Sequence, residues 1–144
     1  MDTLISNDVL MACLIAWTVA QMTKPLIHYV HSRRVHLGYF VSAGGMPSSH
    51  SAVVVALATR VGVDTGLSSV PFAMAAIFAA VVMYDAAGVR RAVSLQARVL
   101  NRMLTEMIEV QHFNESRLRE LIGHTPFEVF VGALLGGLAA ISLR

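Results

Sequence analysis

The chain is poor in cysteine and in charged residues. Only one of its 144 residues is a cysteine, and 14% are charged. Cys13 lies within an apolar run, and a single thiol excludes a disulfide scaffold and a cysteine-based zinc site. A typical soluble domain carries charge on about a quarter of its residues, so the composition argues against that class. The net charge of +2 is no footprint of nucleic-acid binding, and we expect no nucleic-acid partner.

Apolar residues dominate instead. They make up 56% of the chain, and the mean hydropathy is +0.63. Four apolar segments, residues 9–27, 49–63, 70–87 and 126–143, are each close to the length of a short membrane helix. The second contains Arg60, so we expect it to be a short span that needs snorkelling or local membrane thinning. We therefore predict one all-α membrane domain over residues 1–144, a bundle of four short transmembrane helices.

The distribution of basic residues predicts the orientation of this bundle. Residues 24–45 and 88–125 hold nine of the lysines and arginines, whereas only Arg60 and Arg144 fall on the other side. Asp2 and Asp8 precede the first apolar segment without a basic start or a cleavage site, so we expect that helix to be retained. The chain is thus expected to be an integral protein of the cell (inner) membrane, with both long connections facing the cytoplasm.

The second connection contains an amphipathic segment at residues 89–111. Its apolar residues recur at helical spacing, and its charged residues occupy other faces, with Arg102 and Glu106 four apart. This pattern favours an interfacial or partner-packing cytoplasmic helix over a direct role in chemistry.

A glycine-, proline- and serine-rich motif, Gly44-Gly45-Met46-Pro47-Ser48-Ser49-His50-Ser51, runs straight into the second apolar segment. Glycine lets a backbone approach a ligand closely, and the free amides of a first helical turn attract anions. The motif therefore predicts an anion site beside His50. The alternative is an ordinary N-cap on a membrane helix, with His50 at the interface.

A second histidine stands at the start of the fourth apolar segment. Thr125, Pro126 and Glu128 fit an N-cap, a first-turn proline and the acid of a capping box. Glu128 is also placed to hold one tautomer of His124, so that the other ring nitrogen can attack or carry a proton. The sequence leaves both interpretations open.

Asp85 closes the third apolar segment and is followed by Gly88, Arg90 and Arg91. An acid at a membrane boundary usually has a partner, and Lys24 or one of these arginines is the natural candidate. A simple interfacial ion pair and a role in the site are both compatible with this position.

Four stretches of the chain resemble the divergent PAP2 family, whose members are described as related to acid phosphatases and vanadium-dependent haloperoxidases. These stretches are GGMPSSHSA from Gly44, YDAAGVRR from Tyr84, QARVLN from Gln96 and LIGHTPFEV from Leu121. The resemblance runs from about Gln21 to Gly137 and implies a reduced PAP2 core.

The resemblance also implies roles for individual residues. The wider phosphatidic acid phosphatase type 2 superfamily carries the motifs KxxxxxxRP, PSGH and SRxxxxxHxxxD. Pro47 to His50 match the second motif with serine for glycine, which implies that His50 is the general acid and that amides near Ser48 and Ser49 hold phosphate. His124 and Glu128 match HxxxD with Glu for Asp, which implies a nucleophilic histidine and its orienting acid.

The remaining motif positions depart from the superfamily pattern. Lys24 matches the lysine of the first motif, but His31 stands where the arginine is expected. Ser116 and Arg117 resemble the SR pair, although six residues rather than five separate Arg117 from His124. The phosphate clamp is therefore not reproduced in register. The candidates to replace it are Arg90, Arg91, Arg117 and Arg119.

These observations predict a membrane phosphatase for a lipid or isoprenoid phosphate or diphosphate, working through a phosphohistidine. We expect no metal or other cofactor, with vanadate as an inhibitor or phosphate mimic. The alternative is a non-catalytic membrane protein that binds or moves a phosphorylated lipid. A vanadate-dependent oxidase is a third class, but nothing in the sequence points to halide chemistry.

Four spans make a thin scaffold beside the roughly six of the superfamily. Gly132 and Gly136 are four residues apart, a spacing that lets two helices approach closely. This pattern predicts a homodimer that completes the site. The alternative is packing of the last helix on the first or the third within one chain.

Overall fold

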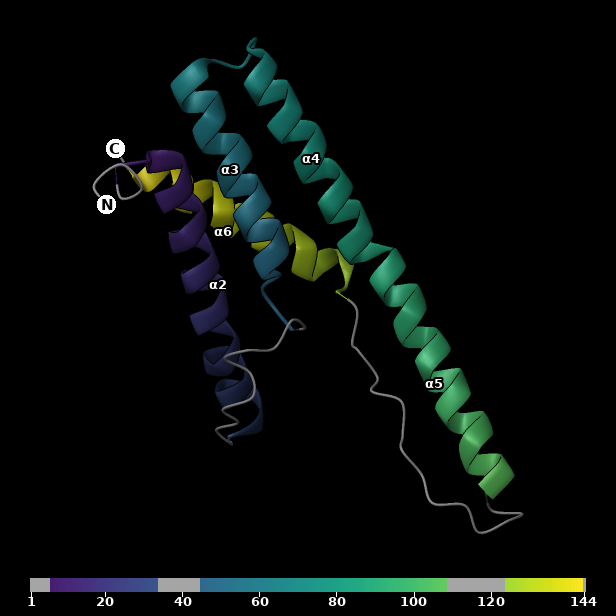
Figure 1. The fold of residues 1–144 in the computed structure, drawn as a ribbon. Helices are drawn as coiled ribbons and strands as arrows, with labels where there is room; N and C mark the ends of the chain where they lie inside the picture. The colour runs from purple at the N-terminus through teal and green to yellow at the C-terminus, as the bar shows by residue number, and fades with distance from the viewer. Residues whose placement is uncertain (1–5, 34–44, 109–123, 144) are drawn as a thin grey trace.

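The computed structural model describes residues 6–33, 45–108 and 124–143, and every structural statement below refers to those residues. They form five helices: α2 (Asp8–Ser32), α3 (Ser49–Thr65), α4 (Val70–Ala87), α5 (Val89–Ile108) and α6 (Pro126–Ser142). Figure 1 shows their arrangement. The four apolar segments lie in α2, α3, α4 and α6, and the amphipathic segment forms α5, so the all-α prediction is confirmed for the described residues. Residues 109–111 of the amphipathic segment lie outside the described ranges.

The helices of the bundle begin at polar N-cap residues. The side-chain oxygens of Asn7, Ser48, Ser69 and Thr125 each accept a hydrogen bond from the backbone amide three residues further on. Such a cap replaces a partner that the first turn of a helix lacks and stabilises it by about 1 kcal/mol. The capping box predicted at the start of α6 is confirmed, since both of its hydrogen bonds are present.

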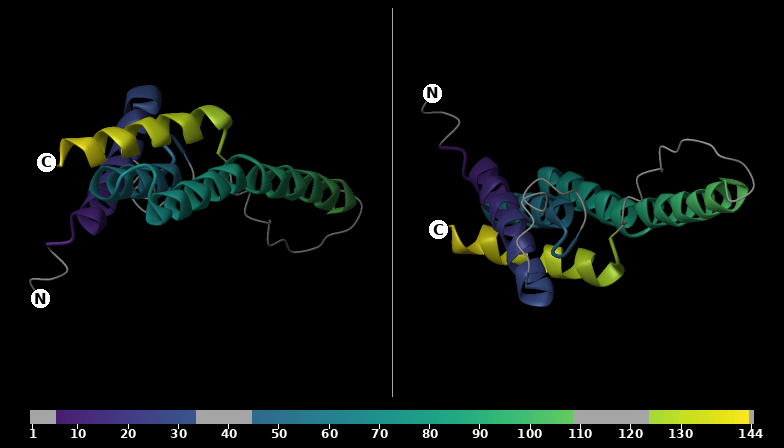
Figure 2. Two further views of the ribbon diagram at one scale, coloured as in Figure 1. Left: turned by 90° about the horizontal axis from the view of Figure 1, so that it is seen from above. Right: turned by 90° about the horizontal axis from the view of Figure 1, so that it is seen from below.

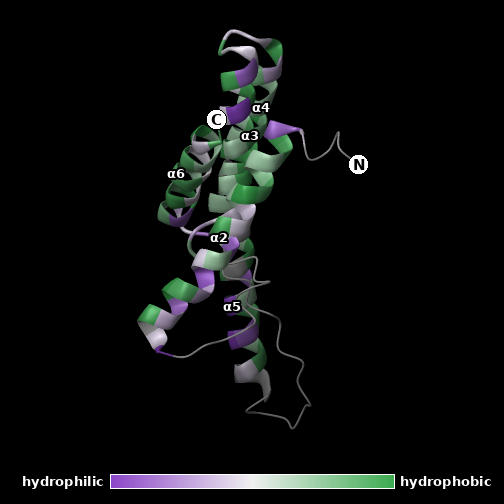
Figure 3. Cartoon of the chain, turned by 90° about the vertical axis from the view of Figure 1, so that its left-hand side faces the viewer, coloured by the Kyte–Doolittle hydropathy of each residue, from purple (hydrophilic) through white to green (hydrophobic). Residues whose placement is uncertain are grey.

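The central helix of the bundle is α3, which contacts α2, α4 and α6 (Figure 2). Small side chains fill the core: the fully buried residues of its cluster are Ala12, Ala16, Ala20, Ala52, Ala56 and Ala140. Many large apolar side chains point outward instead, among them Trp17, Met74 and Phe130 (Figure 3 shows the hydropathy along the chain). Small residues inside and large apolar residues outside suit a bundle surrounded by lipid.

Two glycines of α6 lie directly against the backbone of α3. A Cβ at Gly132 would overlap the carbonyl oxygen of Ser48, and one at Gly136 would overlap that of Ala52. The glycine spacing thus serves contact within one chain. The alternative of packing within one chain is therefore confirmed: α6 contacts α2 and α4, the first and third apolar segments. Its glycines, however, meet α3, the second apolar segment, which that alternative did not name. The homodimer stays a prediction.

Two described helices are long and apolar enough to cross a membrane: α2, over Asp8–Val30, and α4, over Val70–Ala87. The apolar helix α6 is shorter, with 17 residues. The helix α3 also has 17 residues, and it contains Arg60 and Asp64 near its end. The count of four spans therefore stays a prediction, with α2 and α4 as its two candidates by length and composition.

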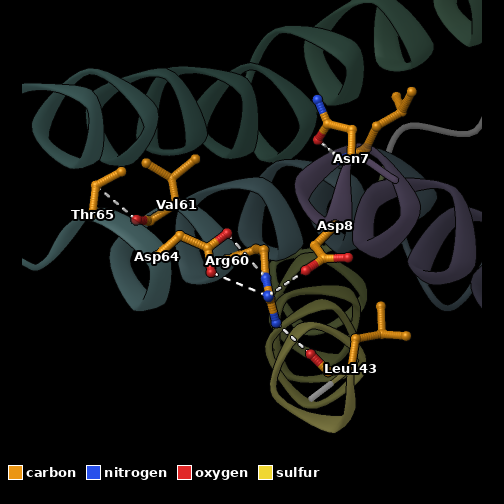
Figure 4. A network of polar contacts seen from close by, with 8 residues as sticks. Asn7, Asp8, Arg60, Val61, Asp64, Thr65 and Leu143 are labelled. Carbon is orange, nitrogen blue, oxygen red and sulfur yellow. Dashed lines mark hydrogen bonds and ion pairs between the residues drawn. The ribbon is translucent and has the colours of Figure 1, made fainter. Parts of the chain in front are cut away.

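Arg60 joins three helices at one end of the bundle (Figure 4). Its guanidinium lies 2.9 Å from the carboxylate of Asp8 and 3.1 Å from that of Asp64, and it also donates to the carbonyl oxygen of Leu143. The start of α2, the last turn of α3 and the end of α6 therefore meet there. The Arg60 side chain was expected to extend toward water at the membrane surface, but its positive charge is paired with carboxylates of the protein. We call this group the Arg60 cluster.

The Arg60 cluster fixes the relative direction of the helices. α2 begins at this cluster, whereas α3 and α6 end there. α3 and α6 therefore both begin toward the opposite end of the bundle (Figure 1). The end of α2 and the starts of α3 and α6 therefore lie away from the cluster. The expectation that both long connections face the cytoplasm stays a prediction.

Candidate functional site

The candidate site lies where α3 and α6 begin. The two helix starts are joined through their backbones, because the amide of Ser48 donates a hydrogen bond of 3.1 Å to the carbonyl oxygen of Glu128. Gly132, one turn further along α6, packs against Ser48 without a side chain between them. Both histidines singled out from the sequence stand at these starts, His50 in the first turn of α3 and His124 just before α6.

The two histidine rings lie edge to face across this junction. Their centroids are 6.2 Å apart, and the ring planes are inclined at 61°. The His124 side chain is almost fully buried, with a relative exposure of 1%. The sequence separation of the two residues is large, so their proximity follows from the close packing of α6 on α3. An edge-on pair of imidazoles at two helix starts is a suitable arrangement for proton transfer to and from a shared ligand.

Glu128 serves His124 and the helix cap at once. Its Oε2 lies 3.4 Å from Nδ1 of His124 and accepts a hydrogen bond of 2.8 Å from the backbone amide of Thr125. The structural and the orienting interpretations of Glu128 therefore do not exclude each other, because one carboxylate oxygen makes both contacts. With Nδ1 toward Glu128, Nε2 is the ring nitrogen on the side of His124 away from this carboxylate.

Lys24 reaches the same junction from α2. Its side chain is buried, and Nζ donates a hydrogen bond of 3.3 Å to Oγ of Ser49. The negative charge of the Glu128 carboxylate attracts the positive charge of the Lys24 ammonium group. A lysine buried in a membrane helix is costly unless it has such partners, and it marks a functional position by default. The lysine matched to the first superfamily motif thus lies beside the serine matched to the second.

The serines of the motif mainly hold the start of α3 together. Ser48 Oγ accepts hydrogen bonds from the amide and from the hydroxyl of Ser51, at 3.3 and 3.0 Å. The amide of Ser48 donates to the backbone carbonyl oxygen of Glu128, and the phosphate-binding role expected for this amide stays a prediction. The amide of Ser49 occupies the first helical position, where a helix supplies no acceptor of its own. The N-cap alternative is therefore realised at Ser48.

Other expected site residues are less closely placed. Gly45 has a φ of +89°, a conformation that favours glycine, and Pro47 is buried between it and the helix. Asp85 is exposed in the last turn of α4. Arg90 and Arg91 belong to the first turn of α5. Outside the described residues lie Gly44, Arg117 and Arg119.

Two buried polar residues of this region were not singled out from the sequence. Ser51 is completely buried and binds Ser48, and its place in the quoted motif was the available signal. Gln21 is buried three residues before Lys24 on α2, so the two share a face of that helix. A polar residue at that spacing from a lysine, inside an apolar run, was the signal for Gln21.

The junction combines several features that suit a phosphate group. Helix starts carry partial positive charge and unsatisfied amides, and Lys24 adds a full positive charge close to Ser49. The two imidazoles supply groups that can attack, donate or accept a proton. Within the described residues, no group of three histidine, cysteine or acidic side chains is placed to hold a metal ion.

Comparison with known proteins agrees with the motifs. The family model described as "Divergent PAP2 family" matches residues 5–139. The chain is 41% identical over 151 aligned positions to a Bacillus subtilis (strain 168) protein named "Uncharacterized membrane protein YuiD", covering 97% of this chain and 96% of that protein. No solved structure matches. With its motifs, its apolar helices and these two matches in agreement, the chain belongs to the divergent PAP2 family.

Proposed function

We propose that this protein hydrolyses a lipid or isoprenoid phosphate or diphosphate through a phosphohistidine. The observation that carries the proposal is the pair of histidine rings at two helix starts, 6.2 Å apart, with Nδ1 of His124 turned toward Glu128. A pair of this kind provides a nucleophile and a general acid for phosphoryl transfer without a metal ion.

The reaction proceeds in two steps. Nε2 of His124 attacks phosphorus, the bond from phosphorus to the ester or bridging oxygen breaks, and protonated His50 gives its proton to that leaving oxygen. Water then attacks the phosphohistidine while His50 takes a proton from it; the N–P bond breaks and inorganic phosphate leaves. Each turnover consumes one water and returns both histidines to their starting state. Glu128 stabilises the positive charge that His124 carries in the intermediate.

Charge around the reacting phosphate supports this role. A phosphoryl group in transfer spreads negative charge over its equatorial oxygens, so catalysis needs cations and amides around them. Lys24 and the first turn of α3 supply these on one side of the junction. The arginines near the site in sequence are the candidates for the rest of the clamp.

The second candidate function is binding of a phosphorylated lipid without hydrolysis. Burial favours it, because Nε2 of His124 lies inside the protein, and a phosphate reaches it only if the groups around it move. The departures from the first superfamily motif support the same alternative. Both candidates use the same anion site. They differ in whether His124 attacks the phosphorus of the ligand, because a binding protein leaves the P–O bond intact.

Phosphate release from the purified protein in lipid nanodiscs tests both candidates. Phosphatidic acid, a prenyl phosphate and a prenyl diphosphate serve as substrates for the wild type, His124→Ala and His28→Ala. His28 lies in α2 outside the described junction, so its variant controls for the loss of a histidine. We expect release by the wild type and His28→Ala and none by His124→Ala. A base-stable, acid-labile phosphoprotein should form in the first two proteins only.

Two results would contradict the proposal. No release by the wild type on any of the three substrates, from protein that still binds vanadate, would reject hydrolysis and leave the binding function. Release that persists in His124→Ala would reject the phosphohistidine.

A further inference from the structure

The helix α5 carries an apolar face that the described chain leaves uncovered. Val93, Leu100 and Leu104 follow one another at seven and four residues, so they share one face of the helix. All three are exposed, Leu100 with 48% of its surface. Among the described helices α5 contacts only α4, to which it is joined, and it extends away from the bundle (Figure 1).

Another face of α5 is polar and basic. Arg98 and Arg102 are four residues apart and exposed, so together they form a basic strip. Arg90 and Arg91 add two more basic residues in the first turn, and the only acidic residue of α5 is Glu106. An exposed apolar face combined with a basic polar face is the pattern of helices that lie in a membrane interface.

The position of α5 provides the second argument. Only Gly88 separates it from α4, one of the two described helices long and apolar enough to span a membrane. The first turn of α5 is therefore at the boundary of the hydrocarbon region. Four arginines directly after a span, in a helix of 20 residues, match the clusters that bind anionic lipid headgroups.

We infer that α5 binds the surface of an anionic lipid leaflet. Val93, Leu100 and Leu104 enter the boundary between headgroups and acyl chains, and Arg98 and Arg102 contact lipid phosphates. The helix is about 30 Å long at 1.5 Å per residue, so it covers a strip of membrane beside the bundle. This inference is independent of the proposed function, because it concerns a surface outside the histidine junction.

In the structure α5 continues in nearly the direction of α4, with Gly88 between the two helices (Figure 1). Gly88, between the two helices, has φ −100° and ψ −75°, which departs from regular helical values. Its amide donates to the carbonyl oxygen of Tyr84 at 2.9 Å, and its own carbonyl accepts from Ala92 at 3.0 Å. These two bonds are the regular ones of a continuing helix, so binding of α5 along the membrane requires it to bend away from the direction of α4. Gly88, the glycine between the two helices, is the point where we place that bend.

A second copy of α5 is a poorer occupant of the apolar face. Paired helices gain specificity when residues beside the seam carry opposite charges. The polar face of α5 instead holds arginines and a single acid, so two copies side by side would bring like charges together. An anionic leaflet offers charges of the opposite sign to every arginine.

Site-directed labelling of the full chain in nanodiscs tests the inference. In a Cys13→Ala background, a single spin label is placed at Leu100→Cys on the apolar face or at Thr105→Cys on the polar face. Each protein is measured in phosphatidylcholine and in phosphatidylcholine with one third phosphatidylglycerol. Collision rates with oxygen, which concentrates in lipid, and with a water-soluble nickel complex report where each label lies.

We expect the label at position 100 to collide with oxygen and the label at 105 with nickel, most strongly in the anionic bilayer. Arg98→Gln with Arg102→Gln should lower the ratio of docked to undocked α5 about 30-fold, since each arginine near an anionic surface contributes roughly a fivefold factor. Equal docking in both bilayers would overturn the inference. So would a position-100 label that is protected from both reagents, which would show a second copy or another protein on this face.

Discussion

Replacing single glycines of α6 by alanine measures how closely that helix lies on α3. In Gly136→Ala the new Cβ would lie 2.8 Å from the carbonyl carbon of Ala52 and 2.9 Å from its Cα, and would overlap the carbonyl oxygen. Non-bonded carbons in proteins keep about 3.5–4.0 Å apart. The atoms in the way are backbone, so no side-chain rotation relieves the overlap, and the two helices must separate.

The neighbouring glycine provides a matched control. In Gly137→Ala the nearest atoms to the new Cβ, Oγ1 of Thr59 and Cγ1 of Val55, are each 3.9 Å away, which is ordinary contact. Both substitutions gain the same intrinsic helix propensity, about 1 kcal/mol. The difference between the variants therefore isolates packing, and overpacking of a close helix contact costs about 1–3 kcal/mol. Gly137→Ala should be at least as stable as the wild type, and Gly136→Ala less stable.

Unfolding by sodium dodecyl sulfate in mixed micelles, followed by far-ultraviolet circular dichroism, compares the three proteins. Gly136→Ala should unfold at a lower fraction of dodecyl sulfate than the wild type, and Gly137→Ala at the same or a higher fraction. If Gly136→Ala unfolded together with Gly137→Ala, the backbones of α3 and α6 would not be in contact at Ala52. The reasoning that places the two histidines together through this contact would then fail.

Three further substitutions separate the site from the scaffold. Glu128→Gln keeps an oxygen that can accept a hydrogen bond from the Thr125 amide but removes the negative charge beside His124. We expect a free energy of unfolding within about 0.5 kcal/mol of the wild type, measured by circular dichroism. Phosphate release should fall roughly 10- to 100-fold in a release assay. Lys24→Met removes the cation beside Ser49, so vanadate binding in a calorimetric titration should weaken at least tenfold, and unchanged affinity would contradict its role in the anion site. Arg60→Met breaks the Arg60 cluster and should cost about 1.5–3 kcal/mol in unfolding experiments, with phosphate release per folded molecule unchanged.

The helices and their starts were accessible from the sequence because they depend on neighbouring residues. Apolar runs of sufficient length identified α2, α3, α4 and α6, and the amphipathic spacing identified α5. The sequence Thr125-Pro126-Phe127-Glu128 predicted the capping box, because its two hydrogen bonds join residues three apart. The first apolar segment ends at residue 27, whereas α2 continues beyond it to Ser32 and the candidate span reaches Val30.

The contacts between helices were not accessible in the same way. The spacing of Gly132 and Gly136 indicates that one face of α6 admits a close neighbour, but spacing does not identify the neighbour, which is α3. The pairing of Arg60 with Asp8, 52 residues away, likewise depends on how α2 and α3 cross. The proximity of Lys24 to Ser49 could be expected only from the resemblance, which assigned both residues to one site.

The backbone contacts at the start of α3 explain why the site and the packing of the bundle are inseparable. Ser48 donates its amide to Glu128 and lies against Gly132, so the residue before His50 is fixed to the helix that follows His124. The separation of the two imidazoles is therefore set by the approach of two main chains, which has less freedom than contact between side chains. The proposed reaction needs the pair placed to within about 0.5 Å, and a glycine in contact with a backbone restricts how far the two helix starts can move apart. The fully buried core cluster consists of alanines, whose side chains interlock little, so this backbone contact constrains the geometry of the histidines directly.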